Sequence, residues 1–159
     1  MTFRKFAAAL ALTVLGASTL AVAQDRKVGD IIHSDARYTT FARAIDAAGL
    51  DNLLANDEAV TVLAPTDDAF AKLPAGTLDN LLKPENKDEL AALLKRHFVV
   101  GSLDQYDLKR QRELATAGGE KLPVKLVAGS IRIADARVFG RQAVAVNGTV
   151  QPLDTVLTH

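Results

Sequence analysis

The chain has 159 residues, with 19 basic and 19 acidic side chains, no cysteine and no tryptophan. The absence of cysteine excludes disulfides and a lipid anchor attached through cysteine, so the core alone must stabilise the fold. The even charge balance argues against a nucleic-acid binder, and the lack of a Lys or Arg run argues against a polybasic membrane contact. The few aromatic rings argue against a stacking platform for sugars or bases.

The N-terminus is typical of an export signal. Arg4 and Lys5 precede an apolar stretch over residues 7–20, and residues 21–23 read Ala-Val-Ala, a cleavage site for signal peptidase. We therefore expect residues 1–23 to be a signal peptide that is removed. The alternative is an uncleaved membrane anchor, for which the apolar run of 18 residues is short.

Cleavage would leave 136 residues with 17 basic and 19 acidic side chains, which suits a single domain. We expect that domain to span residues 24–159, with its core between about residues 28 and 157. No membrane span would remain, and the protein would reach the periplasm, the cell surface or the extracellular medium. The short signal and plain composition are typical of a bacterial protein.

The first half of this domain has helical spacing. Apolar side chains between positions 41 and 48 recur at intervals of three and four, which is the spacing of one helix face. Gly49 follows where a C-terminal glycine cap belongs. Leu50, Leu53 and Leu54 predict a further short helical turn.

Residues 61–74 predict a strand, a turn and a helix in succession. An apolar run ends at Pro65, and Thr66 is a suitable N-cap for a helix. Asp67 and Asp68 then occupy the first turn, where the helix dipole favours negative charge. Phe70 lies on the apolar face of this helix, which ends before Pro74.

Two more helices are expected before the run of strands in the second half of the chain. Thr77 is a suitable N-cap for a short helix that Pro84 ends. Asn86 and Glu89 then resemble a capping box, and the apolar face of the following helix runs to His97.

The second half reads as strands. The sequence predicts a strand over residues 97–100 and a hairpin around Gly118-Gly119. Alternating residues predict strands near residues 130–134 and 143–146, and Asn147-Gly148 is the strongest turn signal in the chain. Helices in front and strands behind indicate an α+β domain.

Three segments together resemble the fasciclin domain family. They are TVLAPTDDAF from Thr61, LLKRHFVVG from Leu93 and NGTVQPLDTVL from Asn147, in the family's order and at about its separation. The resemblance implies a wedge of about seven strands in two packed sheets, with helices covering one side. It also implies an extracellular adhesion and interaction module.

The resemblance makes the motif residues structural. These are Thr66, Asp67, Phe70, His97, Asn147, Gly148 and Asp154. We expect His97 to be a buried histidine that fixes the helix–strand junction; the alternative is a ligand or an acid–base group. Asp154 is expected to accept buried hydrogen bonds near the first segment, so its loss would lower the melting temperature by many degrees.

This chain departs from the family pattern at two places. Arg96 stands where the family usually has Tyr before the histidine, and Gln151 replaces a His that the family often carries. Pro152 cannot donate to a sheet ladder, so its strand is expected to be an edge or to carry a bulge there.

Other candidate sites have simpler explanations. Adjacent Asp67 and Asp68 do not face one another on a helix, and His33 near Asp30 and Asp35 is poor support for a metal. Asn147-Gly148-Thr149 fits the N-glycosylation pattern, but a turn explains it. We therefore predict no metal, no cofactor and no catalytic set.

The function expected from the resemblance is that of a monomeric, non-catalytic adhesion or interaction module. Its partner would be a protein or a component of the matrix or cell surface. For the contact surface we predict Arg96, Tyr106 and a loop over residues 104–112, with Arg96→Glu leaving stability nearly unchanged.

Two other functions stay open. One is a periplasmic binding protein for a small apolar ligand, held between the sheets beside small residues: Ala134, Ala136, Ala143 and Ala145. The other is an enzyme, which would need polar side chains that converge in a cleft.

Overall fold

A computed structural model describes residues 26–158 of the chain. The expected signal peptide lies outside these residues. Within them, no helix has the length and apolar character needed to cross a membrane.

All the helices of the described residues except α8 lie before strand β2, as the helix-rich first half predicts. Their bounds are α2 Val28–Ser34, η1 Ala36–Tyr38, α3 Thr39–Ala48, α4 Asp51–Ala55, α5 Asp67–Ala71, α6 Thr77–Leu81, η2 Pro84–Asn86, α7 Lys87–Lys95 and α8 Gln105–Arg110. Gly49 ends α3 in the left-handed conformation, as expected.

The eight strands of the described residues form two sheets of four. The first has the order β2-β1-β8-β7 and the second the order β3-β4-β5-β6. The strands are β1 Val60–Pro65, β2 Phe98–Val100, β3 Glu113–Ala115, β4 Lys121–Val127, β5 Ser130–Ile133, β6 Ala136–Arg137, β7 Ala143–Ala145 and β8 Gly148–Leu153. The predicted α+β class with two packed sheets is confirmed, with one strand more than expected.

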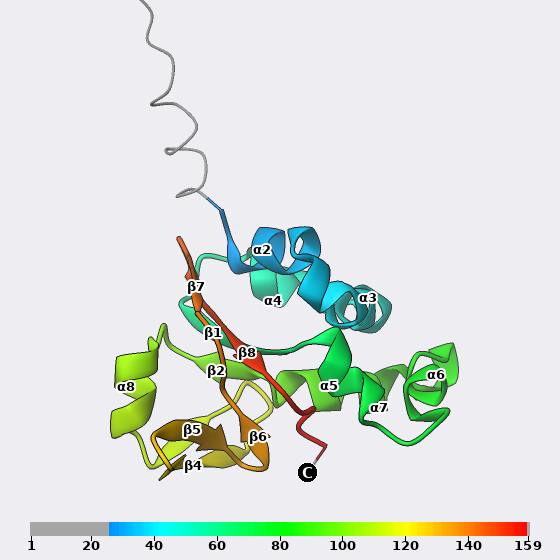
Figure 1. The fold of residues 1–159 in the computed structure, drawn as a ribbon. Helices are drawn as coiled ribbons and strands as arrows, with labels where there is room; N and C mark the ends of the chain where they lie inside the picture. Colours follow the sequence, from blue (N-terminus) through cyan, green and yellow to red (C-terminus); the bar gives the residue numbers. More distant parts are fainter. Residues whose placement is uncertain (1–25, 159) are drawn as a thin grey trace, which may run out of the picture.

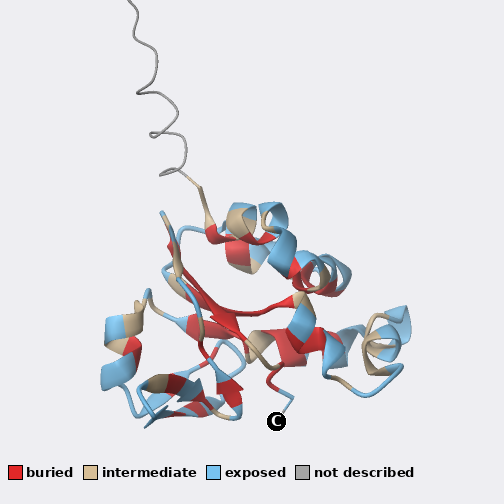
Figure 2. Ribbon diagram, in the orientation of Figure 1, coloured by how far each residue is buried: buried red, intermediate tan, exposed pale blue. Residues whose placement is uncertain are grey.

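The pair of parallel strands β1 and β8 is the centre of the fold. These strands carry two of the fasciclin-like segments and pair over six residues, from Val60 opposite Gly148 to Pro65 opposite Leu153. All of β8 and nearly all of β1 are buried, and Figure 2 shows this buried band running through the molecule.

Each face of the first sheet has its own hydrophobic core. On one face Val62 and Val150 pack with apolar side chains of helices α2 to α7. On the other face Leu63 and Leu153 pack with the second sheet and with Leu108 of α8. Figure 1 shows α2, α3 and α4 across one side of the sheet, with α8, β4 and β5 on the other. Helices therefore cover one side, as the resemblance implies, with α8 as the exception.

Three local predictions were wrong. Residues 105–110 form helix α8 where a loop was expected, because Asp104 and Asp107 make a reciprocal capping box. Gly76, and not Thr77, caps α6. Asn86 caps α7 without a side-chain bond, since its Nδ2 donates to the carbonyl of Asn80.

The prediction that Pro152 lies on an edge strand was also wrong, because β8 lies between β1 and β7 in the sheet. Its pairing with β7 ends at Val150, however, while its pairing with β1 continues to Leu153. On the side away from β1 Pro152 faces residues 138–139, where its carbonyl accepts from the N–H of Phe139 and an isolated bridge joins Val138 to Leu153. No regular strand ladder on that side needs the missing N–H.

Gly148 is required by a close approach of the backbone. A Cβ at this position would lie 1.7 Å from the carbonyl oxygen of Val60, its partner in the β1–β8 pair. Neither strand can move without disturbing the cores on both faces.

We predict that Gly148→Ala destabilises the domain by about 3 kcal/mol or more, because the added methyl group forces the central strands apart. Urea unfolding measures the change. Gly118→Ala is the control, since its Cβ would make an ordinary 3.4 Å contact with Lys95. Equal stability of the two variants would show that the β1–β8 spacing is not rigid.

Candidate functional site

His97 links the end of α7 to the C-terminal segment. The buried imidazole donates from Nδ1 to the carbonyl of Leu93 at 2.9 Å and accepts at Nε2 from the N–H of Leu157 at 3.0 Å. Because a backbone N–H can only donate, Nε2 must be unprotonated. Burial, together with the smaller effect of the positive charge of Arg96, lowers the pKa of His97 to about 4. This geometry supports the structural role and leaves no free nitrogen for catalysis.

We predict that His97 makes the domain less stable in acid. Its pKa is lower in the folded chain than in the unfolded chain, so the unfolded state binds more protons between pH 6.5 and about 4. The stability that it contributes is complete above pH 6.5 and falls by about 3 kcal/mol as the pH drops to 4.

Urea unfolding at pH 7 and pH 4 tests this, with His97→Gln as the comparison because an amide can replace both hydrogen bonds without titrating. The difference between the two pH values should shrink in the variant. An unchanged difference would assign the acid sensitivity to carboxylates.

Asp67 joins two helices that are distant in sequence. Its Oδ1 accepts from the backbone N–H of Thr40 at 2.7 Å, in the first turn of α3. Asp67 therefore satisfies a free N–H of α3, while it also begins α5. Phe70, on the same helix, packs against the ring of Phe41 at 6.4 Å. The contacts of both residues lie within the fold, and the bond to Thr40 has no signal in the sequence.

Thr66 does not cap α5 with its side chain, so this part of the prediction was wrong. The helix begins after it, but its buried Oγ1 has no hydrogen-bond partner among the described residues. Its backbone N–H donates to the carbonyl of Leu153, which ties it to β8.

Asn147, just before β8, is bonded to the start of α2 and the end of α4 through its side-chain amide and to β1 through its backbone. Oδ1 accepts from the N–H of Val28, and Nδ2 donates to the carbonyls of Leu54 and Asn56, at 2.9 to 3.0 Å. Its own carbonyl accepts from the N–H of Val60. The nitrogen that glycosylation would modify is thus buried and bonded, in agreement with the structural reading of this motif.

Asp154 has a different place from the one predicted. The half-buried carboxylate accepts from the N–H of Arg137 at 2.8 Å and from the Thr155 hydroxyl at 3.0 Å. It therefore stabilises the end of β6 and does not bond to the first fasciclin-like segment. Because the bond to Arg137 is exposed and the other is only partly buried, the expected cost of removing Asp154 is smaller than the sequence suggested.

We predict that Asn147→Ala costs about 3 kcal/mol and Asp154→Ala about 1 kcal/mol, since the first leaves three backbone groups unpaired, two of them in buried bonds. Thermal unfolding of the two variants measures the order. A larger effect for Asp154→Ala would mean that the C-terminal segment, and not Asn147, fixes the ends of the sheet.

The guanidinium group of Arg96 is already hydrogen-bonded to other residues of this chain. It makes two hydrogen bonds to the Glu120 carboxylate, at 2.7 and 3.0 Å, and a third to the carbonyl of Thr158 at 2.8 Å. The paired groups give Arg96 a structural role that the sequence did not indicate. We therefore no longer expect Arg96→Glu to leave stability unchanged, because it would place two carboxylates together.

Tyr106 lies on α8 and its side chain is 66% exposed. It borders a surface groove of about 420 Å³ together with Asp104, Gln105, Arg141 and Gln142. Arg96 lines a different groove, next to Glu120 and Gly118. The structure thus places the two predicted contact residues in separate grooves.

Glutamine side chains hold the floor of the Tyr106 groove. Gln142 Oε1 accepts from the N–H of Gln105 at 2.8 Å and from Nε2 of the buried Gln151 at 2.8 Å. Gln105 Nε2 donates to the carbonyl of Gly140 at 3.0 Å. Gln151, which departs from the family pattern, therefore supports this groove. Neither Arg141 nor Gln142 was predicted, because only the fold brings them beside Tyr106.

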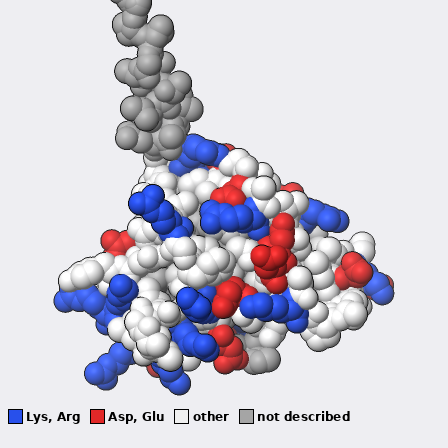
Figure 3. All heavy atoms as spheres, in the orientation of Figure 1, with Lys and Arg blue, Asp and Glu red and all other residues white. Residues whose placement is uncertain are grey.

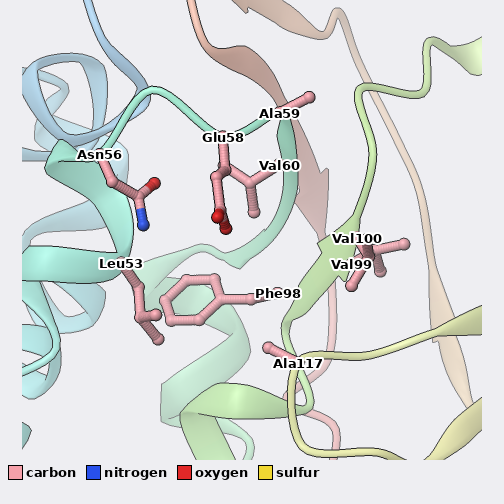
Figure 4. Close-up of a pocket in the computed structure, with 9 residues that line it drawn as sticks. All are labelled: Leu53, Asn56, Glu58, Ala59, Val60, Phe98, Val99, Val100 and Ala117. Atoms are coloured by element: carbon pink, nitrogen blue, oxygen red, sulfur yellow. The ribbon is translucent and has the colours of Figure 1, made fainter.

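An apolar pocket lies at the end of β1 and β2. Leu53 and Phe98 lie side by side at its centre, with Val60, Val100 and Ala117 around them (Figure 4). Its volume of about 90 Å³ is well below the 300 Å³ or more of typical small-molecule sites. None of the alanines expected to border a ligand lines this pocket. It gives little support for a small-ligand binding protein.

His33 meets carboxylates other than those considered from the sequence. Its Nε2 lies 2.9 Å from Asp46 and 4.0 Å from Asp51, and its Nδ1 lies 2.9 Å from the carbonyl of Gly29. The hydrogen bond to Asp46 raises the pKa of His33 above its usual value. An exposed imidazole–carboxylate pair accounts for this arrangement, and we assign no metal to it.

The comparison with known families agrees with the three segments. The fasciclin domain model matches residues 36–159, so the chain belongs to the fasciclin domain family. The structure resembles a FAS1 domain pair from the insect cell adhesion molecule fasciclin I, with a TM-score of 0.75 and 18% identity. The match covers 86% of this chain and 52% of that one, and it shows the shared fold.

Two relatives illustrate the range of the family. Protein sll1483 of Synechocystis sp. is 38% identical over 120 residues, which cover 76% of this chain and 66% of the relative. Transforming growth factor-beta-induced protein ig-h3 of Sus scrofa is 33% identical over 130 residues, which cover 82% of this chain and 19% of the relative. The chain therefore spans only part of either protein.

Proposed function

We propose that this protein is an exported, non-catalytic interaction module of the bacterial envelope or surface that supports adhesion. The resemblance to a domain pair of a cell adhesion molecule supports this proposal. So does the use of the motif residues, since the His97 and Asn147 side chains are committed to internal hydrogen bonds. The partner would be a protein or a matrix component, bound by a monomer without a cofactor.

The observation that carries the proposal is the groove beside Tyr106. Tyr and Arg dominate the binding energy of protein interfaces, and Tyr106 and Arg141 both border this groove. The hydrogen bonds of Gln105, Gln142 and Gln151 hold its floor before a partner arrives. A surface that is ordered in advance loses less entropy on binding.

We predict that deleting the gene reduces the attachment of cells to surfaces or to partner cells, and that the wild-type gene restores it. Tyr106→Ala should fail to restore attachment although the protein is exported in equal amount. Val100→Ala is the matched control, because Val100 is 67% exposed and lies in the separate apolar pocket. Normal attachment of the deletion strain would refute the adhesion proposal, and rescue by Tyr106→Ala would refute the groove.

Arg96 stays a second proposed contact, and a charge swap tests it. Arg96→Glu breaks the pair with Glu120, whereas Arg96→Glu combined with Glu120→Arg restores a pair with the charges exchanged. A true contact at Arg96 should be lost in both variants. Recovery of attachment in the double variant would leave Arg96 with its structural role alone.

A further inference from the structure

Strands β4, β5 and β6 place three basic side chains in one row. Lys125 lies directly opposite Arg132, and Arg132 lies directly opposite Arg137. All three residues are exposed. Since neighbouring strands are about 4.8 Å apart, the three side chains stand next to one another on the outer face of the second sheet. We refer to Lys125, Arg132 and Arg137 as the basic row.

The basic row works against the stability of the sheet. Like charges directly opposite each other on neighbouring strands repel, and here the repulsion occurs twice. Elsewhere in the same sheet opposite charges approach one another, since Lys121 of β4 lies diagonally across from Glu113 of β3 at 3.8 Å. A row of like charges at the surface is explained most directly by an anionic partner that neutralises it.

The part of the molecule around this row is also positive. Residues 105–141, which include α8 and the second sheet, contain eight basic and four acidic side chains. The other described residues contain nine basic and fourteen acidic side chains. Figure 3 shows Lys and Arg gathered over the region where Figure 1 places α8, β4 and β5. The charge is thus divided between the two ends of the molecule, although the total is close to zero.

Two aliphatic side chains extend from the same hairpin. Leu126 and Val127, at the end of β4, are 54% and 46% exposed. Val127 lies two residues from Lys125 and therefore on the same face of the strand as the basic row, whereas Leu126 lies on the other face at the end of the hairpin. We refer to Leu126 and Val127 as the aliphatic tip.

We propose that the basic row and the aliphatic tip dock the protein on an anionic phospholipid surface. Arg forms paired hydrogen bonds with phosphate groups, and basic side chains are drawn to the surface of an anionic bilayer. An aliphatic tip can enter the boundary between the head groups and the acyl chains. A soluble polyanion would neutralise the row equally well but would leave the tip in water, which is why the observations favour a bilayer.

Vesicle co-sedimentation of the purified protein tests this proposal. One set of vesicles contains phosphatidylcholine alone, and in the other phosphatidylglycerol replaces part of it. The row variant carries Lys125→Gln, Arg132→Gln and Arg137→Gln. The control variant removes the same charge from exposed residues of the helical part through Arg43→Gln, Lys72→Gln and Lys83→Gln. A tip variant carries Leu126→Ser and Val127→Ser, and circular dichroism verifies that each variant folds.

We expect the wild type to bind the anionic vesicles and not the neutral ones, with binding that weakens as salt rises. The row variant should bind at least about tenfold more weakly, while the control variant binds like the wild type. The tip variant should also lose vesicle binding but keep any binding to soluble dextran sulfate.

Three results would overturn the proposal. The wild type could fail to bind anionic vesicles, or the row and control variants could lose binding equally, which would leave net charge as the only cause. Full vesicle binding by the tip variant, together with tight binding of dextran sulfate, would identify a soluble polyanion as the ligand.

Discussion

The parallel pairing of β1 with β8 is the constraint on which the rest of the structure depends. The two strands are 88 residues apart where Thr61 meets Thr149, yet they form the middle of the first sheet. One face of this pair supports the helical core and the other supports the core shared with the second sheet. Such a distant pairing pays a large loop-closure entropy, so it requires dense packing on both faces.

The residues around this pair explain why the fasciclin-like segments contain what they do. Gly148 permits the contact with Val60, and Asn147 holds the beginning of α2 and the end of α4 against the same point. His97 and Asp67 make equivalent connections at the opposite end of the strands. These motif residues therefore hold the scaffold together through internal contacts, and the groove proposed for a partner, beside Tyr106, lies outside the three segments.

Local chemistry made much of the fold predictable from the sequence. The spacing around Phe41, the glycine cap at Gly49 and the turn at Asn147-Gly148 each act within a few residues. Helix α8 was missed because two aspartates make its capping box, and the expected box at Asn86 failed because a nearby carbonyl took the side chain. The partners of Asp67, Asp154 and Arg96 could not be predicted, because each lies across the fold.

The distribution of charge on the surface could not be predicted from the sequence either. The sequence contains no run of basic residues, since Lys125, Arg132 and Arg137 are separated by seven and five positions. The turns of two hairpins bring them into register. A charge balance near zero thus conceals a molecule with one positive and one negative end, which orients in a field as a neutral sphere would not.

The β1–β8 pair also determines how the domain would respond to mechanical tension. The carbonyl of Arg26 accepts from the N–H of Val146, just before β8 begins, and the chain leaves the sheet again at the other end of β8. A pull between these two points acts along the strand, so its ladder bonds to β1 are loaded together in shear and do not open one after another. A domain with this geometry resists extension most strongly when it is pulled between these two points.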